Sequence, residues 1–377
     1  MRIESFRAGR WEKQFRYKSF LPETVNHGWE WEDPRLNTLL ETASRRLAEL
    51  DAFSLIVPDI DLFIRLHTVK EASLSSRIEG TETEVETAVL PKEEVPPERR
   101  NDWIEVNNYV MAMNHAVNAL ENLPLSNRLL REAHGVLMQG VRGESKTPGE
   151  FRRSQNWIGG SGPSDAAFVP PIHTHVPDLM GDLEKFWHNE NLEVPHLVRI
   201  AISHYQFETI HPFQDGNGRI GRLMVPLYLI DKKLLRKPSL YISAFLEKNR
   251  TSYYDALSRV HTSNDLGQWL RFFLNAITES AQSGIETFQR ILVLRKEVDE
   301  KMIGLGKRAA NARRLMECLY QSAVLSVNEA ARRLDVTHQT ANALINEFER
   351  LGLVEEITGY QRNRLYLFRQ YVDLFHR

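Results

Sequence analysis

Apolar residues recur at intervals of three and four along most of this 377-residue chain, which is the spacing of a helix face buried against a core. Between these periodic stretches lie segments rich in Gly, Pro and charged residues, where helices end. The sequence therefore predicts a mainly α-helical fold. The segments predicted as helical are residues 36–50, 62–75, 103–120, 127–137, 197–209, 220–230, 253–258 and 269–298, the last as one or two long helices.

Charge and cysteine content exclude several classes of protein. Lys and Arg total 48 and Asp and Glu total 50, so the net charge of −2 excludes a strongly basic nucleic-acid coat and an acidic disordered tail. The one cysteine, Cys318, cannot form an internal disulfide or a cysteine-based zinc knuckle, and it fits a reducing compartment. No stretch approaches about 18 uninterrupted apolar residues, and the N-terminus lacks the apolar core of a secretory signal. We therefore expect a cytoplasmic protein without a membrane span.

Breaks in the helical pattern suggest how the chain is divided. Residues 1–34 are polar and aromatic, which is typical of an arm that packs on a neighbour. The Pro-rich, charged residues 91–100 predict a linker or exposed loop. Residues 140–170 are rich in Gly, Ser and Pro and predict a long loop that carries a small hairpin, and loops of that length are usually functional. The composition changes again after Gly304 and Gly306, where a compact C-terminal unit begins.

The most informative segment lies between two helical stretches and reads His-Pro-Phe-Gln-Asp-Gly-Asn-Gly-Arg-Ile-Gly-Arg over residues 211–222. Its Gly-Asn-Gly tripeptide, residues 216–218, permits unusual backbone angles, so that N–H groups can converge on an anion at the start of the next helix. Arg219 and Arg222 are three residues apart and can lie on one helix face, where both can donate to phosphate oxygens.

Two further side chains complete this candidate site. Asp215 supplies a hard oxygen ligand, and Mg²⁺ commonly bridges one or two carboxylates and substrate phosphates. His211 can act as a base near neutral pH. A base, a metal ligand, a glycine cradle and two arginines within one short segment favour a phosphate-binding active site over a polar helix–helix connection.

The same segment matches, at every defining position, the signature of the Fic (filamentation induced by cAMP) family, His-Pro-Phe-x-Asp-Gly-Asn-Gly-Arg-x-x-Arg. The resemblance extends over most of residues 35–300 and implies a helical bundle that usually transfers AMP from ATP to a protein hydroxyl. It implies that His211 deprotonates a Ser, Thr or Tyr hydroxyl of the target, that Asp215 holds Mg²⁺ on the α- and β-phosphates, and that Arg222 contacts the γ-phosphate. Other members transfer different phosphate-containing groups or reverse the reaction.

The resemblance also implies a nucleotide pocket beyond the motif, in which aromatic and amide groups contact the adenine. Core packing is an equally good interpretation for each tyrosine of this set. The implied nucleotide-binding residues are Asp215, Gly216, Asn217, Gly218, Arg219, Arg222, Tyr241, Asn249, Tyr253 and Tyr254.

Residues 75–80 read Ser-Ser-Arg-Ile-Glu-Gly and resemble the inhibitory motif of Fic proteins, Ser/Thr-x-x-x-Glu-Gly/Asn, in the self-inhibited class with an N-terminal inhibitory helix. Ser75 and Glu79 are four residues apart on one helix face, and Gly80 follows where a C-terminal glycine is expected. The resemblance implies that Glu79 pairs with Arg222 and leaves ATP in a non-productive pose. An exposed polar helix end is the alternative interpretation.

The loop before the motif predicts a surface that holds the target. In Fic proteins a hairpin flap pairs with the target peptide as an added strand, and the implied flap residues here are Phe168, Val169 and Pro170. A plain surface loop is the alternative. His173 and His175 form a His-x-His pair, for which a surface or target-contact role is favoured over a metal because no Cys or third placed ligand accompanies them.

The C-terminal unit resembles a winged helix-turn-helix. Residues 326–334 predict a short capped helix, residues 338–351 an amphipathic helix, and apolar pieces on either side of Gly359 a two-stranded wing. A DNA reader would use the start of its second helix and its wing, but the mild basic excess keeps protein docking or dimerisation open. The candidate DNA contacts are Thr337, His338, Gln339, Thr340, Asn342, Arg362 and Arg364.

The predicted organisation has three parts. Residues 1–100 form an N-terminal arm and inhibitory helical region, residues 101–300 the Fic catalytic core with its hairpin flap, and residues 301–377 a winged helix-turn-helix. The leading hypothesis is a protein adenylyltransferase that uses ATP and Mg²⁺ and is held inactive by Glu79 and Arg222. The alternatives are a DNA-binding transcriptional regulator with a nucleotide-sensing core and an enzyme that removes AMP. The expected partners are a target protein hydroxyl, duplex DNA and, in a homodimer, a second copy of the chain.

Overall fold

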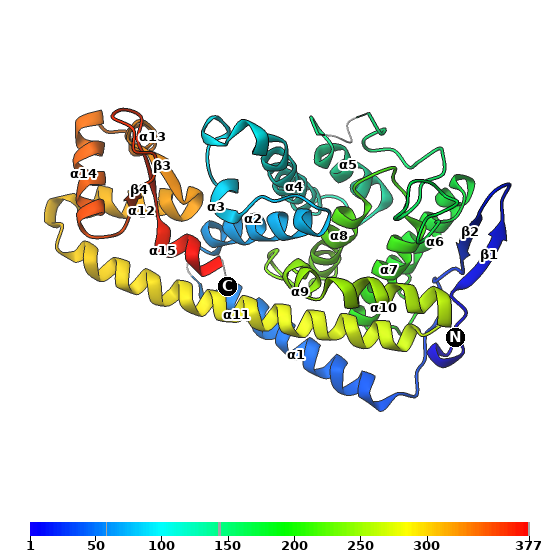
Figure 1. Ribbon diagram of the computed structural model, residues 1–377. Helices are drawn as coiled ribbons and strands as arrows, with labels where there is room; N and C mark the ends of the chain where they lie inside the picture. Colours follow the sequence, from blue (N-terminus) through cyan, green and yellow to red (C-terminus); the bar gives the residue numbers. More distant parts are fainter. Residues whose placement is uncertain (58, 142–144, 376–377) are drawn as a thin grey trace.

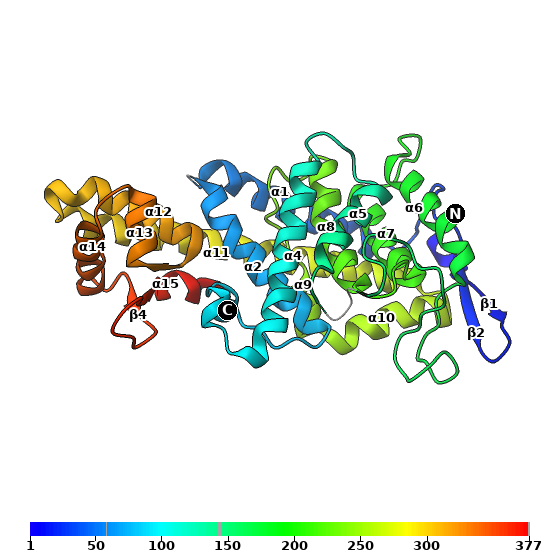
Figure 2. The ribbon, with the colours of Figure 1, turned by 90° about the horizontal axis from the view of Figure 1, so that it is seen from above.

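The computed structural model describes residues 1–57, 59–141 and 145–375, and it shows an elongated, mainly helical molecule (Figure 1). The C-terminal unit lies at one end and a two-stranded hairpin near the N-terminus at the other (Figures 1 and 2). The α-helices are α1 Pro34–Ile56, α2 Ile60–Ile78, α3 Val85–Ala88, α4 Arg100–Ala119, α5 Asn127–Leu137, α6 Val176–His188, α7 His196–Ile210, α8 Asn217–Asp231, α9 Ser243–Lys248, α10 Arg250–Ser263, α11 Leu266–Ile303, α12 Ala309–Ser322, α13 Val327–Leu334, α14 His338–Arg350 and α15 Arg369–Val372. The strands are β1 Gly9–Lys13, β2 Lys18–Pro22, β3 Val324–Ser326, β4 Glu355–Glu356 and β5 Leu365–Leu367.

Helix α11 runs along most of the length of the molecule as one continuous helix, where the sequence predicted one or two (Figure 1). Asp265 caps it by accepting a hydrogen bond from the backbone N–H of Gln268 at 3.0 Å. Helix α1 packs along it. At Gly284 the two helices approach so closely that a Cβ would lie 2.9 Å from Cδ1 of Leu50, so a side chain there would force them apart. The long helix therefore supports both the central helices and the C-terminal unit.

Helices α7 and α8 form the centre of the fold, and the motif loop joins them. Helix α7 is buried on nearly all sides, and its backbone receives a hydrogen bond of 2.8 Å from the indole N–H of Trp269 to the carbonyl of Ala201. Helices α1, α6 and α11 pack against α7, while α2, α4 and α5 pack against α8. Its buried polar residues, such as Arg199 and His204, bond to neighbouring groups, and this burial of α7 fixes the start of the loop.

The N-terminal arm packs on the rest of the chain through its buried side chains. Strands β1 and β2 pair antiparallel, from Gly9 opposite Pro22 to Lys13 opposite Lys18. Beyond the hairpin, the Asp182 carboxylate of α6 accepts the backbone N–H of Val25 at 2.7 Å. These contacts join residues far apart in the sequence.

In the C-terminal unit, helices α12, α13 and α14 pack beside a three-stranded antiparallel sheet of order β3-β5-β4. The Ser326 and Thr337 side chains cap α13 and α14. The two-stranded wing predicted here differs in detail: β3 adds a third strand to the sheet, and Leu353 and Val354 precede β4 as buried core residues. None of the described helices is long and apolar enough to cross a membrane.

Candidate active site

The motif loop leaves α7 and enters α8 through two left-handed residues. His211 ends α7 with φ 50° and ψ 61°, and Gly216 precedes α8 with φ 75°. A left-handed conformation is unusual for a non-glycine residue, and such strain concentrates at functional sites. The Asn217 side chain braces the loop because it both accepts from the N–H of Phe213 and donates to its carbonyl, each at 2.8 Å. The loop is therefore held in one shape by its own side chains.

Residues far from the motif hold the loop from outside, and the sequence analysis did not find them. The Arg152 guanidinium donates to the carbonyl of His211 at 2.9 Å, and the Asn156 amide donates to the same carbonyl at 3.1 Å. The ring of His134 stacks on Phe213 with centroids 3.9 Å apart. His134 Nδ1 accepts from a backbone N–H, so its Nε2 donates to the carbonyl of Asp215 at 3.0 Å. The signal in the sequence that could have identified these residues is that polar side chains occur in and near the Gly-rich loop.

The protonation state of His211 suits a base. Burial, as the main cause, lowers its pKa to about 4, so the imidazole is neutral at pH 7. Its Nδ1 lies 3.2 Å from the carbonyl oxygen of Glu208. Because a carbonyl only accepts, Nδ1 carries the proton and Nε2 keeps a free lone pair. The other ring nitrogen can therefore take a proton from a hydroxyl group placed in the adjoining cavity.

A cavity of about 590 Å³ adjoins this loop. It brings together the end of α2, the flap loop, the motif and α10. The sequence-predicted residues that line it are Glu79, Phe168, His211, Asp215, Gly216, Asn217, Gly218, Arg222, Tyr253 and Tyr254. The predicted residues that do not line it are Ser75, Gly80, Val169, Pro170, Arg219, Tyr241 and Asn249.

Arg222 is 1% exposed and is held by the end of α2. Its Nη2 donates to Oε1 of Glu79 at 2.7 Å and to the carbonyl of Ser75 at 2.9 Å, and its Nε donates to Oγ of Ser75 at 2.8 Å. Burial, the largest cause, disfavours the Glu79 carboxylate, but the charge and hydrogen bond of Arg222 together with electrostatic interactions with Arg219 and His211 outweigh it, so the pKa of Glu79 is lowered. The carboxylate also lies against the backbone of Gly218, where a Cβ would be 2.2 Å from Oε1. The Glu79 carboxylate thus both pairs with Arg222 and covers the backbone at the start of α8.

Arg219 does not face the cavity, which differs from the predicted pairing of both arginines at one phosphate site. Its Nη1 lies 3.3 Å from the Glu105 carboxylate of α4, and its Nη2 lies 3.8 Å from the Met138 sulfur. The buried carboxylate draws the guanidinium toward α4, while a longer ion pair of 3.9 Å reaches Asp215. Arg219 therefore joins α8 to α4 in this structure.

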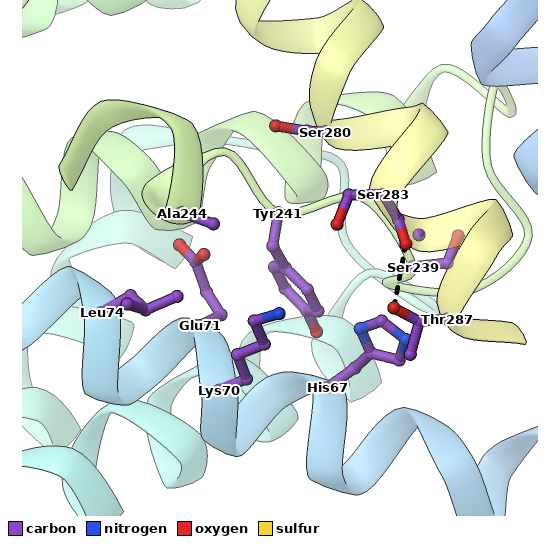
Figure 3. Close-up of a pocket in the computed structure, with 11 residues that line it drawn as sticks. His67, Lys70, Glu71, Leu74, Ser239, Tyr241, Ala244, Ser280, Ser283 and Thr287 are labelled. Carbon is purple, nitrogen blue, oxygen red and sulfur yellow. Dashed lines mark hydrogen bonds between the residues drawn. The ribbon is translucent and has the colours of Figure 1, made fainter. Parts of the chain in front are cut away.

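The predicted adenine contacts separate into two groups. Tyr253 and Tyr254 line the cavity, and the Tyr253 hydroxyl bonds Nε2 of the buried His204 at 2.9 Å. Tyr241 lies instead in a second, smaller cavity between α2 and α11, where its hydroxyl is 2.8 Å from Thr68 (Figure 3). Asn249 donates to the carbonyl of Phe245 at 2.9 Å and closes α9. The structure places these last two side chains in packing and capping positions.

The flap is a short hairpin whose strands meet at one bridge. Phe168 and Ile158 exchange backbone hydrogen bonds of 2.8 and 3.1 Å, and both residues line the cavity. The carbonyl of Val169 accepts from the backbone N–H of Phe20, and the carbonyl of Pro170 accepts from the Gln155 side chain. Of the three predicted flap residues, Phe168 alone faces the cavity, and the next carbonyl is already bonded to the N-terminal arm.

The donors and acceptors of the cavity fit a magnesium–triphosphate group. The Asp215 carboxylate is 40% exposed, with Oδ1 accepting from the Gly216 N–H at 2.7 Å and Oδ2 lying 3.6 Å from Lys146. Among the described residues no group of three His, Cys, Asp or Glu side chains forms a metal site. One carboxylate can nevertheless hold Mg²⁺ when phosphates and water supply its other ligands, and the N-terminus of α8 suits the phosphates.

The candidate DNA contacts lie far from this cavity, at the opposite end of the molecule (Figure 1). His338, Gln339 and Thr340 are exposed in the first turn of α14, and Arg362 and Arg364 are exposed between β4 and β5.

Comparison with known proteins agrees with this geometry. Residues 37–118 match the Fic/DOC family N-terminal model, and residues 124–229 match the Fic/DOC family model. The chain therefore contains a Fic/DOC family domain together with the N-terminal region of that family.

Relatives and solved structures extend the comparison. "Protein adenylyltransferase Fic" of Aedes aegypti is 36% identical over 126 residues, which are 33% of this chain and 22% of that protein. The Drosophila erecta protein of the same name is 29% identical over 175 residues, 45% of this chain and 32% of that protein. This chain thus matches less than a third of the length of either relative.

A crystal structure of a Fic family protein from Desulfovibrio desulfuricans G20 aligns with a TM-score of 0.57 at 22% identity, covering 89% of this chain and 96% of that one. Fic-1 (residues 134–508) from C. elegans aligns with a TM-score of 0.51 at 21% identity, covering 70% and 75%. The fold is the mainly helical Fic fold with small antiparallel sheets.

Proposed function

We propose that this protein is a protein adenylyltransferase that transfers AMP from ATP to a Ser, Thr or Tyr hydroxyl of a target protein. The observation that carries the proposal is the neutral imidazole of His211, which has its Nδ1 proton directed at the Glu208 carbonyl and lies on the cavity wall beside the N-terminus of α8. The adenylyltransferase names of the insect relatives support it.

The side chains have separate roles in the proposed reaction. The backbone N–H groups of Asn217 and Gly218 would hold phosphate oxygens, since these residues open α8 and carry its positive dipole end. Asp215 would hold Mg²⁺, which supplies charge neutralisation at the phosphates. His211 Nε2 would accept the hydroxyl proton as the oxygen attacks the α-phosphorus and pyrophosphate leaves.

The proposal includes inhibition by the chain itself. Arg222 is the cavity-lining arginine of the motif, and its Nε and Nη2 already donate three hydrogen bonds to Glu79 and Ser75. A γ-phosphate would have to displace the Glu79 carboxylate from both Arg222 and Gly218, and the two anions cannot occupy one position. Removing Glu79 should therefore create the anion site.

The test is incubation of the purified wild type, Glu79→Gly and Glu79→Gly/His211→Ala with ATP labelled on the α-phosphate and a cell lysate. We expect a labelled protein band with Glu79→Gly, a weaker one with the wild type and none with the double variant. Labelling by Glu79→Gly equal to that of the wild type would contradict the inhibitory role, and labelling by the double variant would contradict the base.

We also propose that residues 301–377 form a winged helix-turn-helix that binds duplex DNA. The supporting observation is that the first turn of α14 presents His338, Gln339 and Thr340 to solvent, with Arg362 and Arg364 exposed on the neighbouring β4–β5 loop. A mobility-shift assay should show binding that weakens as salt rises and that is lost in Arg362→Ala/Arg364→Ala. Binding unchanged in that variant would favour protein docking or a homodimer through this unit.

A further inference from the structure

The tip of the β1–β2 hairpin carries positive charge and an exposed aromatic ring. Phe15 is 91% exposed, and the Arg16 guanidinium lies over its ring, 5.3 Å from the centroid. Lys13, Arg16 and Lys18 are exposed, and none of them has a carboxylate within 4.0 Å among the described residues. We call Lys13, Phe15, Arg16 and Lys18 the hairpin tip. It presents three cations around one apolar ring, and none of the three is neutralised by a carboxylate of the part of the chain that the structure describes.

The base of the hairpin, in contrast, is firmly anchored. Phe20 is buried, and its ring contacts Trp11 and Phe168 at centroid distances of 5.1 and 5.9 Å. Glu12, the acidic residue within the two strands, is engaged by Arg10 at 3.0 Å and lies 3.8 Å from His175. The tip is thus an extension of fixed position, and Figure 2 shows the hairpin projecting from one end of the molecule.

The anchoring contacts lead directly to the active-site cavity. The Phe20 N–H donates to the carbonyl of Val169 at 2.9 Å, so β2 is bonded to the flap. Phe168 stacks on His261 with centroids 4.5 Å apart, Trp11 packs on both rings, and Phe168 and His261 both line the cavity. The hairpin is therefore joined to the cavity rim by a backbone hydrogen bond and a continuous set of rings.

We propose that the hairpin tip is a docking surface for an acidic segment of the target protein, and so helps select which hydroxyl reaches His211. This inference rests on the proposed transferase function. Arginine and lysine bind carboxylates, and an exposed Phe beside them suits an apolar or aromatic residue in the same segment. Nucleic acid would also be attracted to the charge, but the bond between the hairpin and the flap links this surface to protein substrate. The occupant is therefore a peptide chain.

The geometry sets where the acidic residues should lie. Strand β1 is extended from Trp11, whose ring packs on the cavity-lining Phe168, to Lys13, a span of about 7 Å at about 3.3 Å per residue. Phe15 and Arg16 lie in the turn beyond it. The acidic residues of the target should therefore lie more than two residues from the modified hydroxyl, and positions four to six are the ones to test.

Binding and transfer are measured separately, so that failure of one does not obscure the other. The probe is a fluorescein-labelled peptide with a central Tyr and three Glu residues placed four to six positions away, compared with the same peptide carrying Gln at those positions. Anisotropy without ATP should show the Glu peptide binding the wild type at least about fivefold more tightly than the Gln peptide, as expected for three exposed ion pairs. That preference should disappear in Lys13→Ala/Arg16→Ala/Lys18→Ala.

The matched control is Arg45→Ala/Lys296→Ala/Lys301→Ala, which removes three exposed cations away from the cavity and should bind like the wild type.

In the Glu79→Gly background, AMP transfer to the Glu peptide should show a raised KM in the tip variant with little change in kcat. Equal binding of both peptides by the wild type, or equal loss in tip and control variants, would overturn the docking surface. Binding of a single-stranded oligonucleotide more tightly than the Glu peptide would overturn it in favour of nucleic acid. Preferential peptide binding without any transfer would leave the docking surface standing and count against the transferase.

Discussion

Two walls of the same cavity use charge in opposite ways. On the α2 wall, Arg222 is buried and donates hydrogen bonds to Glu79 and Ser75 of the same chain. The flap wall is bonded to the N-terminal hairpin, whose tip lies outside the cavity and carries exposed cations that meet no carboxylate among the described residues. The first arrangement holds the protein in one state, whereas the second remains open to another molecule.

The difference has an energetic consequence. Removing Glu79, whose side chain is 38% exposed, leaves the buried Arg222 charge without its partner, at a cost that stays below the value of about 3–5 kcal/mol for a fully buried pair and that a new counter-ion can offset. An exposed charge is compensated by water and salt when its partner is absent. The α2 wall should therefore act as a switch that depends on Glu79, and the flap wall should contribute graded affinity.

The largest expected effect concerns His211, the proposed base, which lies in the cavity that the two walls share. His211→Ala in the Glu79→Gly background should lower kcat by about 10²–10⁴-fold, because the neutral imidazole no longer takes the hydroxyl proton. The measurement is the initial rate of AMP incorporation from labelled ATP. His115→Ala, which changes an exposed histidine on α4, is the matched control and should leave the rate unaltered. A rate preserved in the His211 variant would mean that another group in the cavity acts as base.

The second effect concerns the α2 wall alone. Glu79→Gly should raise the transfer rate at fixed ATP by about 5–150-fold, the range of a coupling free energy of about 1–3 kcal/mol. Glu79→Gln keeps a hydrogen-bonding group but loses the charge and should give an intermediate rise. Glu84→Gln, which breaks the exposed Arg77 ion pair close by, is the control and should have little effect. A similar rise in the control would attribute activation to loosening of α2 rather than to the release of Arg222.

The sequence was sufficient to locate the motif because its site residues are close together in the sequence. His211, Asp215 and the residues at 216–218 are nearly consecutive, so their joint position follows from one loop between two helices. The same is true of the helix that carries Glu79, although the Arg222 contact joins residues 143 positions apart and came only from family resemblance.

Side chains placed by tertiary packing could not be assigned in this way. Tyr241 follows the motif at the expected distance but lies between α2 and α11, and Arg219 turns to the Glu105 carboxylate of α4. Arg152 and Asn156 approach the motif from about 60 residues away and carry no spacing signal. Such positions depend on which helices become neighbours, which hydrophobic periodicity alone does not specify.

The third effect separates the two walls by salt. Raising NaCl from 0.05 to 0.5 M should weaken binding of the Glu peptide by several-fold, because the charges of the hairpin tip are exposed and the Debye length falls below about 5 Å. The ratio of Glu79→Gly to wild-type rates should change by less than about twofold, since Arg222 is 1% exposed. Anisotropy at each ionic strength tests the weakening of peptide binding, and rate measurements at the same ionic strengths test the ratio of Glu79→Gly to wild-type rates. If salt removed the inhibition as readily as the peptide binding, the two walls would not differ as described.

The smallest expected effect is a near absence of pH dependence. Burial lowers the pKa of His211 to about 4, so the base form is the one present above pH 4 and is lost only as the pH falls through that value. From pH 7 to pH 5.5 the rate of Glu79→Gly should therefore fall by less than about twofold, whereas a histidine of ordinary pKa near 6.5 would lose about tenfold.

Glu208 also lines the cavity, and burial raises its pKa to about 7, so Glu79→Gly/Glu208→Gln provides the profile without that group. Buried histidines with lowered pKa values also destabilise the fold as the pH falls below about 6.5, because the unfolded chain then binds more protons. Tm at each pH must accordingly accompany the rates, and a tenfold loss at pH 5.5 without a fall in Tm would show that the imidazole is exposed to water during turnover.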